Sequence, residues 1–319
     1  MKAGLRLPLT VAIGLVLAAV VAVGAPLVLS DYFTRILILI ALNSILVLSL
    51  SLSNGFTGVF SLGHVGFVGA GAYASGILSL TVQQKAALLP HLPTLLSGFS
   101  LPFLPATLAA GLFTALLAVI VGYPLMRLSG YFVSVATMGF LIIVNVVLIN
   151  AADFTRGSRT FTGVPLQTNL PWVMGWLAVT LLLLARLVYS PFGRSMMAVR
   201  DDTIAAGAVG IDVLSTRLVA FVIGAFFAGA GGSLYAHYLG SFSPITFYFA
   251  MTLNLIAMLV LGGMGSLSGA LIGVVCVSLL SEVLRSAERG FSLLGVTVPP
   301  LFGASQIVLG ILFILIMIF

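Results

Sequence analysis

The stretch SPFGRSMMAVRDDTIAAGAVGIDVLSTR, residues 190–217, is a charged segment in a chain otherwise built from apolar runs. Of the 319 residues, 61% are hydrophobic and 6% are charged, yet this segment holds six charged residues, Arg194, Arg200, Asp201, Asp202, Asp212 and Arg217. A charge at the centre of a membrane helix costs about 2.5–3.5 kcal/mol on insertion scales, so this density belongs in water. The segment therefore lies between two membrane spans.

The charged segment also has the signals of a folded loop. Asp202 can cap a short helix over residues 203–209, and Gly210 can end it in a left-handed conformation. Asp212 can then cap the helix that enters the membrane at Leu218. A capped helix in water between two spans offers a surface to a partner at the membrane face.

The composition of the rest of the chain predicts a polytopic membrane protein. Its mean hydropathy is +1.28, and its apolar fraction exceeds the roughly 45–50% of soluble domains. No hydrophilic stretch is long enough for a separate soluble domain, so we expect a single transmembrane domain over 1–319. The net charge of +6 fits contact with anionic lipid headgroups rather than nucleic acid. The single cysteine, Cys276, excludes an intrachain disulfide framework.

Apolar runs predict an all-α transmembrane bundle of about ten spans. The predicted spans are 9–29, 36–53, 65–82, 104–122, 131–150, 171–188, 218–239, 248–264, 269–285 and 303–319. The first apolar run is longer than a usual signal-peptide core, which favours a retained first span over a cleaved one.

Two uncharged, Gly-rich segments interrupt this pattern. The first, SNGFTGVFSLGH, covers 53–64, and the second, GGMGS, covers 262–266. Each is either a tight turn or a broken, re-entrant helix. The stretches 60–78 and 263–280 share a Gly-Ser-Leu or Ser-Leu-Gly entry followed by small residues. This likeness predicts a two-fold internal repeat, although Gly-rich membrane helices also resemble one another by chance.

The number of predicted spans indicates the orientation of the chain in the membrane more clearly than the distribution of charge does. Basic residues are almost evenly divided between the two predicted sides, so the positive-inside rule barely discriminates. An even number of predicted spans precedes 190–217, which places this loop on the same side as Lys2 and Arg6. We therefore expect the N-terminus and the loop 189–217 to be cytoplasmic.

The Gly-rich segments are also where a solute could approach the backbone. Irregular backbone at membrane depth is tolerated where it is buried in protein or lines a cavity. Ser61 could cap the following helix and leave its N–H groups facing an anionic solute group. For each such residue the alternative is close helix packing or structural hydrogen bonding. The predicted translocation-path residues are Ser61, Gly63, His64, Gly66, Gly262, Gly263, Gly265 and Ser266.

The absence of several motifs from the sequence narrows the range of possible functions. No span carries the interior carboxylate pair or His–Glu arrangement of a proton-coupled transporter. No phosphate-binding P-loop motif is present, so ATP hydrolysis is not expected in this chain. No metal-ligand spacing or nucleophile–base pair indicates an enzyme. A stand-alone secondary transporter or facilitator, and a membrane enzyme or assembly scaffold, remain as alternatives to an importer subunit.

Four ordered motifs resemble one family. GFTGVFSLGHVGFVGAGAYASGIL (55–78), residues 128–150, residues 190–236 and MLVLGGMGSLSGALIGVVCVSLLSEVLR (258–285) are similar to permease subunits of branched-chain amino acid ABC importers. The segment 128–150 resembles the LivM-type subunit rather than its LivH-type partner. Thr203 and Gly207 stand where family members usually carry acidic residues, and the loop 153–165 follows the family pattern loosely.

The resemblance implies a role for 189–217 and a set of partners. It implies a coupling loop that docks on an ATPase subunit, with the coupling residues Arg194, Arg200, Asp201, Asp202, Ala205, Ala206 and Gly210. It further implies a second, LivH-like permease, two ABC ATPase subunits that bind ATP and Mg, and an extracytoplasmic solute-binding protein. No cofactor is expected in this chain. Such a complex belongs in a bacterial or archaeal plasma membrane. Branched-chain amino acids, urea, short amides and aromatic acids are the candidate substrates.

Overall fold

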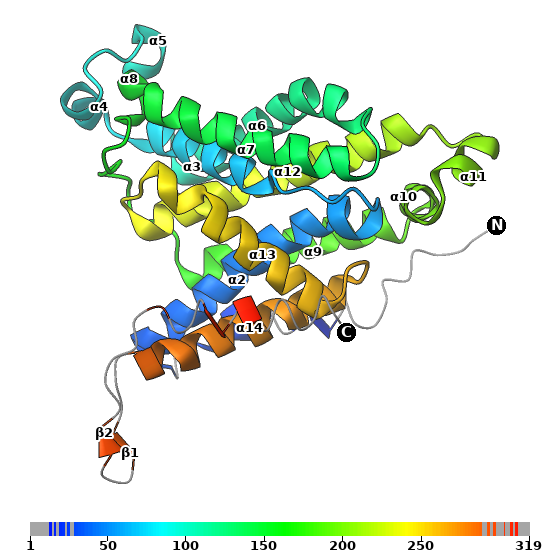
Figure 1. The fold of residues 1–319 in the computed structure, drawn as a ribbon. Coiled ribbons are helices and arrows are strands. Elements are labelled where there is room, and N and C mark those ends of the chain that lie inside the picture. Colours follow the sequence, from blue (N-terminus) through cyan, green and yellow to red (C-terminus); the bar gives the residue numbers. More distant parts are fainter. Residues whose placement is uncertain are drawn as a thin grey trace.

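A computed structural model describes residues 29–288 continuously, with short stretches before and after them. The described chain is a bundle of helices, so the predicted all-α class is confirmed (Figure 1). Outside the bundle, β1 (Ser292–Leu293) pairs antiparallel with β2 (Val296–Thr297). The predicted spans 9–29 and 303–319 fall largely on residues outside the described part, and are not assessed by it.

Seven helices of the described residues are long and apolar enough to cross a membrane. An eighth crossing results if α3 (His64–Ser79) and α4 (Val82–Leu88), which are bent by 118°, form one broken span. Each predicted span between 36 and 285 coincides with a helix, but a total of about ten is not confirmed. The long helices are α2 (Asp31–Ser51), α6 (Phe103–Met126), α7 (Tyr131–Asn150), α9 (Leu170–Val188), α12 (Val213–Leu239), α13 (Phe249–Gly262) and α14 (Leu267–Glu288).

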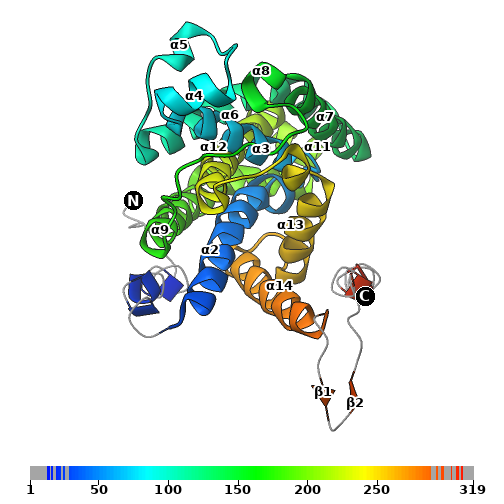
Figure 2. The same cartoon turned by 90° about the vertical axis from the view of Figure 1, so that its left-hand side faces the viewer.

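Helix α3 lies in the middle of the bundle, packed between α6, α7 and α12 (Figure 2). Its position depends on small residues, because a Cβ on Gly71 would lie 2.4 Å from Gly229 Cα of α12. In return, a Cβ on Gly232 of α12 would lie 2.1 Å from Val68 O. The two backbones therefore touch, which only glycine allows. Gly71 thus lies on a packing face of α3.

The first Gly-rich segment begins as a helix and continues as extended chain. Helix α2 passes directly into a π-helical turn, η1 (Leu52–Phe56), so the helix extends beyond the predicted end at 53. Residues 57–63 are non-helical and lead into α3, whose N-cap is Gly63. The expected cap by Ser61 is wrong, since α3 begins after Gly63 without a side-chain cap, and Ser61 Oγ instead accepts the N–H of Gly63 itself at 3.4 Å. π-Turns are rare and are frequently found at functional sites.

Both Gly-rich segments lie at one end of the bundle. The second forms the tight turn between α13 and α14, where Gly263 and Gly265 have φ of +94° and +100°. The same end carries α10 (Pro191–Asp201) and α11 (Thr203–Ala208), while α4, α5 (Thr94–Ser97) and α8 (Ala152–Thr155) lie at the opposite end (Figure 1). A short 3-10 turn, η2 (Pro244–Phe247), precedes α13. The internal repeat is not confirmed by this arrangement.

Candidate coupling loop and solute path

The charged loop folds through caps that its sequence encodes. Asp202 Oδ1 accepts the N–H groups of Ile204 and Ala205 at 2.8 and 3.0 Å, which starts α11. Gly210 has a φ of +85°, and Asp212 Oδ1 accepts Ser215 N–H at 3.1 Å to start α12. These predicted caps are confirmed, and α11 ends at Ala208, one residue before the predicted end.

Helix α10 was missed from the sequence, although its start carries a clear signal. Ser190 is the N-cap, its hydroxyl accepting Gly193 N–H at 3.3 Å, and Pro191 occupies the first turn. Proline is favoured there because its missing N–H is unneeded. Met196 and Val199, on the inner side of the helix, are buried. The loop is therefore two capped helices, α10 and α11, and not one.

The two faces of α11 differ sharply in exposure. Ile204 is 83% exposed and Val209 is 77% exposed, whereas Ala206 is only 3% exposed. Ile204 is therefore available for a partner. Ala206 instead faces the chain itself, so its predicted place on the docking face does not match its burial. The exposed members of the predicted coupling set are Arg194, Arg200, Asp201, Asp202, Ala205 and Gly210.

The side chain of Arg200 turns from the loop toward the bundle. Its Nη1 donates to Gly55 O of η1 at 3.3 Å. Its Nε donates to Asp201 Oδ1 at 2.9 Å, and the same carboxylate faces Nη2. Gly265 of the second Gly-rich segment lies beside the guanidinium as well. The loop thus contacts both Gly-rich segments through one side chain.

Side chains satisfy the extended backbone around Ser61. Asn54 Oδ1 accepts Ser61 N–H at 3.0 Å, and Asn54 Nδ2 donates to Ser61 O at 3.3 Å. From α7, Thr137 Oγ1 accepts Leu62 N–H at 3.0 Å and Ser134 Oγ donates to Phe60 O at 2.7 Å. Irregular backbone is tolerated in a membrane protein when its polar groups are paired in this way. The first Gly-rich segment is therefore fixed against η1 and α7.

Residues 61–66 of the predicted path are buried within the chain. His64 Nε2 lies 2.8 Å from Ser49 Oγ, whose own hydrogen is donated to Leu46 O. The imidazole must then be the donor in this pair, which ties the start of α3 to α2. A Cβ on Gly63 would lie 2.4 Å from Thr137 O, and one on Gly66 would lie 3.1 Å from the Phe140 ring. In this conformation these positions serve close packing.

The path residues of the second Gly-rich segment lie nearer the surface. Ser266 is exposed, and its hydroxyl accepts Gly269 N–H at 3.0 Å at the start of α14. Gly262 packs against α14, because its Cβ would lie 2.0 Å from Gly269 O. The two Gly-rich segments meet where a Cβ on Gly55 would lie 2.8 Å from Gly265 N.

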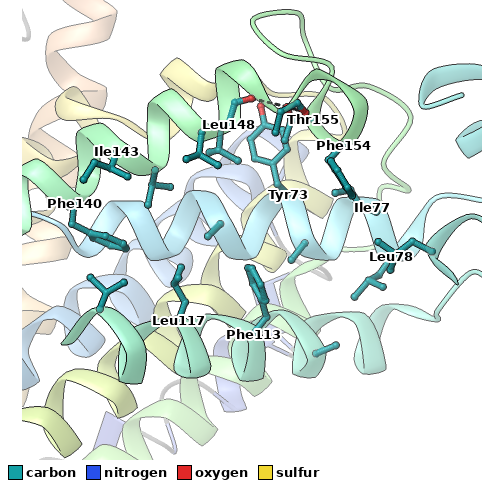
Figure 3. Close-up of a pocket in the computed structure, with 18 of the residues that line it drawn as sticks. Tyr73, Ile77, Leu78, Phe113, Leu117, Phe140, Ile143, Leu148, Phe154 and Thr155 are labelled. Carbon is teal, nitrogen blue, oxygen red and sulfur yellow. Dashed lines mark hydrogen bonds between the residues drawn. The ribbon is translucent and has the colours of Figure 1, made fainter. Parts of the chain in front are cut away.

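An apolar cavity of about 810 Å³ lies elsewhere, between α3, α6 and α7 (Figure 3). Ala70 and Ala74 of α3 line it, together with Phe113 of α6 and Ile143 of α7. Tyr73 is buried beside it, and its hydroxyl has no hydrogen-bond partner among the described residues. In the sequence, only the small residues of α3 indicate this cavity. The residues that line the cavity carry no charge. Within the described residues no His, Cys, Asp and Glu cluster could hold a metal ion.

Comparisons with known proteins agree with this architecture. The model of the family "branched-chain amino acid transport system / permease component" matches residues 32–317. The LivM permease of Escherichia coli K12 is 29% identical over 305 residues, covering 85% of this chain and 68% of LivM. The LivH permease of the same organism is 30% identical over 162 residues, covering 45% of this chain and 52% of LivH.

A more distant similarity points to the same class of protein. The autoinducer 2 import system permease LsrC of Klebsiella pneumoniae is 34% identical over 119 residues, covering 35% of this chain and 34% of LsrC. No solved structure matches. With a family model matching 32–317 and several helices able to cross a membrane, the chain belongs to the branched-chain amino acid transport permease family.

Proposed function

We propose that the chain is a permease subunit of an ABC importer for branched-chain amino acids, and that it couples to an ATPase through 189–217. The observation that carries the proposal is the pair α10–α11: a capped helix with Ile204 and Val209 exposed, at the same end as both Gly-rich segments. A contiguous apolar patch exposed on a folded loop in water is typical of a protein contact.

The partners follow from the relatives. LivM and LivH are both named as permeases of a branched-chain amino acid transport system, which supports pairing with a second, LivH-like permease. Two ABC ATPase subunits would bind ATP and Mg and supply the energy, so this chain would not itself be an enzyme. An extracytoplasmic binding protein would deliver the solute. Urea, short amides and aromatic acids remain alternative substrates.

The proposed membrane arrangement is a single domain over 1–319 with about ten spans, including one on either side of the described bundle. The N-terminus and 189–217 would be cytoplasmic, in a bacterial or archaeal plasma membrane. The two stretches that resemble each other, 60–78 and 263–280, would be equivalent parts of two repeats. Both begin at the α10–α11 end of the bundle.

The solute is proposed to pass the Gly-rich segments, at a surface that the second permease completes. Ser61 and Ser266 are suitable probes, since cysteine there adds little volume. In a Cys276→Ala background, labelling of both cysteines by a water-soluble thiol reagent should change with the nucleotide state, while Leu39→Cys stays unlabelled. If neither serine site is labelled in any state, the path lies elsewhere and these residues only pack.

A stand-alone facilitator is the competing function, and reconstitution separates the two. Liposomes holding the permease pair, the ATPases and the binding protein should take up labelled L-leucine only with ATP. Liposomes holding this chain alone should take up none. Robust uptake by the single chain would reject the importer subunit in favour of the facilitator.

A further inference from the structure

The Arg200 side chain occupies the point where three segments meet. It leaves the C-terminal turn of α10 and reaches the end of η1, where Nη1 donates to Gly55 O at 3.3 Å. Asp201 holds the other side of the guanidinium, with both Nε and Nη2 at 2.9 Å from Oδ1. The Arg200 side chain is 34% exposed, whereas the Asp201 side chain is 66% exposed. The arginine is therefore turned inward and its partner carboxylate faces out.

Glycines leave the room that Arg200 fills. Gly58 has a φ of +69°, and a Cβ there would lie 2.9 Å from Arg200 Cγ. Gly265 has a φ of +100°, and its Cβ would lie 2.8 Å from Arg200 Nη1. A Cβ on Gly55 would likewise lie 2.8 Å from Gly265 N. No larger residue fits these approaches without displacing the guanidinium or the turns.

We propose that Arg200 is a positioning residue that transmits movement of α10–α11 to both Gly-rich segments at once. The proposal rests on the function proposed above. Nη1 donates to Gly55 O and packs beside Gly265, so a shift of α10 acts on the first segment through a hydrogen bond and on the second through a packing contact. These two segments join α2 to α3 and α13 to α14, so one side chain reaches the ends of four helices.

This role differs from that of a docking arginine on the loop surface. A docking residue holds the ATPase, so its loss weakens the complex. A positioning residue acts after docking, so its loss leaves the complex intact and breaks the transfer of movement. The two are distinguished by measuring assembly and stimulated ATP hydrolysis on the same variants.

The test uses the full complex of both permeases, the ATPases and the binding protein with L-leucine. Arg200→Ala should co-purify with the ATPases at the wild-type level, while stimulation of ATP hydrolysis by the loaded binding protein falls about five- to tenfold. Arg200→Lys should recover part of the stimulation, because an ammonium reaches Gly55 O but cannot hold Asp201 through two nitrogens. Arg186→Ala, which removes an exposed arginine at the end of α9, is the matched control and should behave as wild type.

Hydrogen exchange tests the contact itself, without any transport activity. In Arg200→Ala, amides of 52–60 and of 262–267 should both exchange faster, and in Arg186→Ala neither should change. Gly58→Ala displaces Arg200 from the other side of the contact and should lower stimulation as well. In the double variant, the loss of stimulation should be smaller than the sum of the losses in Gly58→Ala and Arg200→Ala, because both substitutions break the same contact.

Specific results would overturn the proposal. Loss of ATPase co-purification in Arg200→Ala would make Arg200 a docking residue. Wild-type stimulation in Arg200→Ala, or unchanged exchange in both Gly-rich segments, would remove it from transmission. A wild-type complex that shows no stimulation rejects the proposed function instead, and the exchange experiment then still decides whether Arg200 holds the two turns.

Discussion

At the scale of single residues, several cationic side chains of the described part, Lys85 and Arg200 among them, donate to backbone carbonyls. Lys85 of α4 is fully buried, and its Nζ donates to Leu96 O at 2.7 Å and to Phe99 O at 2.6 Å. The ammonium also lies 5.1 Å from the centre of the Phe99 ring. A buried charge is stable only when its donors are satisfied, and here one lysine holds the loop between α4 and α6.

We expect Lys85→Ala to lower the thermal unfolding midpoint of the detergent-purified protein. It removes two hydrogen bonds from a charged donor to the part-buried carbonyls of Leu96 and Phe99, at about 1–3 kcal/mol in total because water can reach these oxygens. His91→Ala, on an exposed residue of the same loop, is the control and should leave the midpoint unchanged. Equal midpoints for the two variants would mean that water replaces the ammonium.

Two helical glycines give an opposite pair of expectations. Gly71→Ala pushes a methyl group into the Gly229 backbone, where only 2.4 Å is available, and should destabilise the protein by about 1–3 kcal/mol. Gly139→Ala meets no atom within 4 Å and should be neutral or stabilising by up to about 1 kcal/mol, because alanine favours helix. The thermal unfolding midpoints of the two variants in detergent test both expectations. A stable Gly71→Ala protein would contradict the backbone contact between α3 and α12.

At the scale of elements, α11 has an exposed face, which is the proposed docking face, and a buried packing face. Ile204→Glu places a charge on the exposed face, so co-purification with the ATPase should fall while the unfolding midpoint stays unchanged. Ala206→Glu places a charge on the buried face and should lower both, since an unpaired buried carboxylate destabilises the loop. Should Ile204→Glu retain full ATPase binding, α11 would not be the docking helix.

Local signals made part of this region predictable. The caps by Asp202 and Asp212 depend on residues within three positions of each other, so the sequence alone defines the starts of α11 and α12. The middle spans are predictable because each apolar run is continuous. Helix α10 is missed only because its charges suggest a loop more strongly than its Ser-Pro start suggests a helix.

Contacts between distant segments were beyond such reasoning. The inward turn of Arg200 depends on Gly55, 145 positions earlier, and the burial of Ala206 depends on the packing of α11 against its neighbours. The π-turn η1 replaces a boundary that hydropathy placed at 53, because Asn54 and Thr57 pair with nearby backbone and prolong the helix. The cavity between α3, α6 and α7 likewise arises from how three helices diverge, which no single run of residues encodes.

At the scale of the whole molecule, the arrangement of the helices allows a test of how the chain is oriented in the membrane. The distribution of basic residues does not decide this orientation. Helices α10 and α11 lie at one end of the bundle and α4 and α5 at the other (Figure 1). Thr203 and Gln83 are exposed at these opposite ends. Because the long helices alternate in direction between the two ends, an impermeant reagent must reach only one of them in a sealed cell.

We therefore expect single cysteines at these positions, in a Cys276→Ala background, to label on opposite sides. Gln83→Cys should react with an impermeant maleimide in intact cells, and Thr203→Cys only after permeabilisation. The background alone is the control for labelling elsewhere. The reverse pattern would put α11 outside the cell, where ATP and an ATPase are absent, and would end the coupling role of the loop even if the fold is unchanged. Labelling of both positions in intact cells would instead contradict the assignment of the bundle axis to the membrane normal.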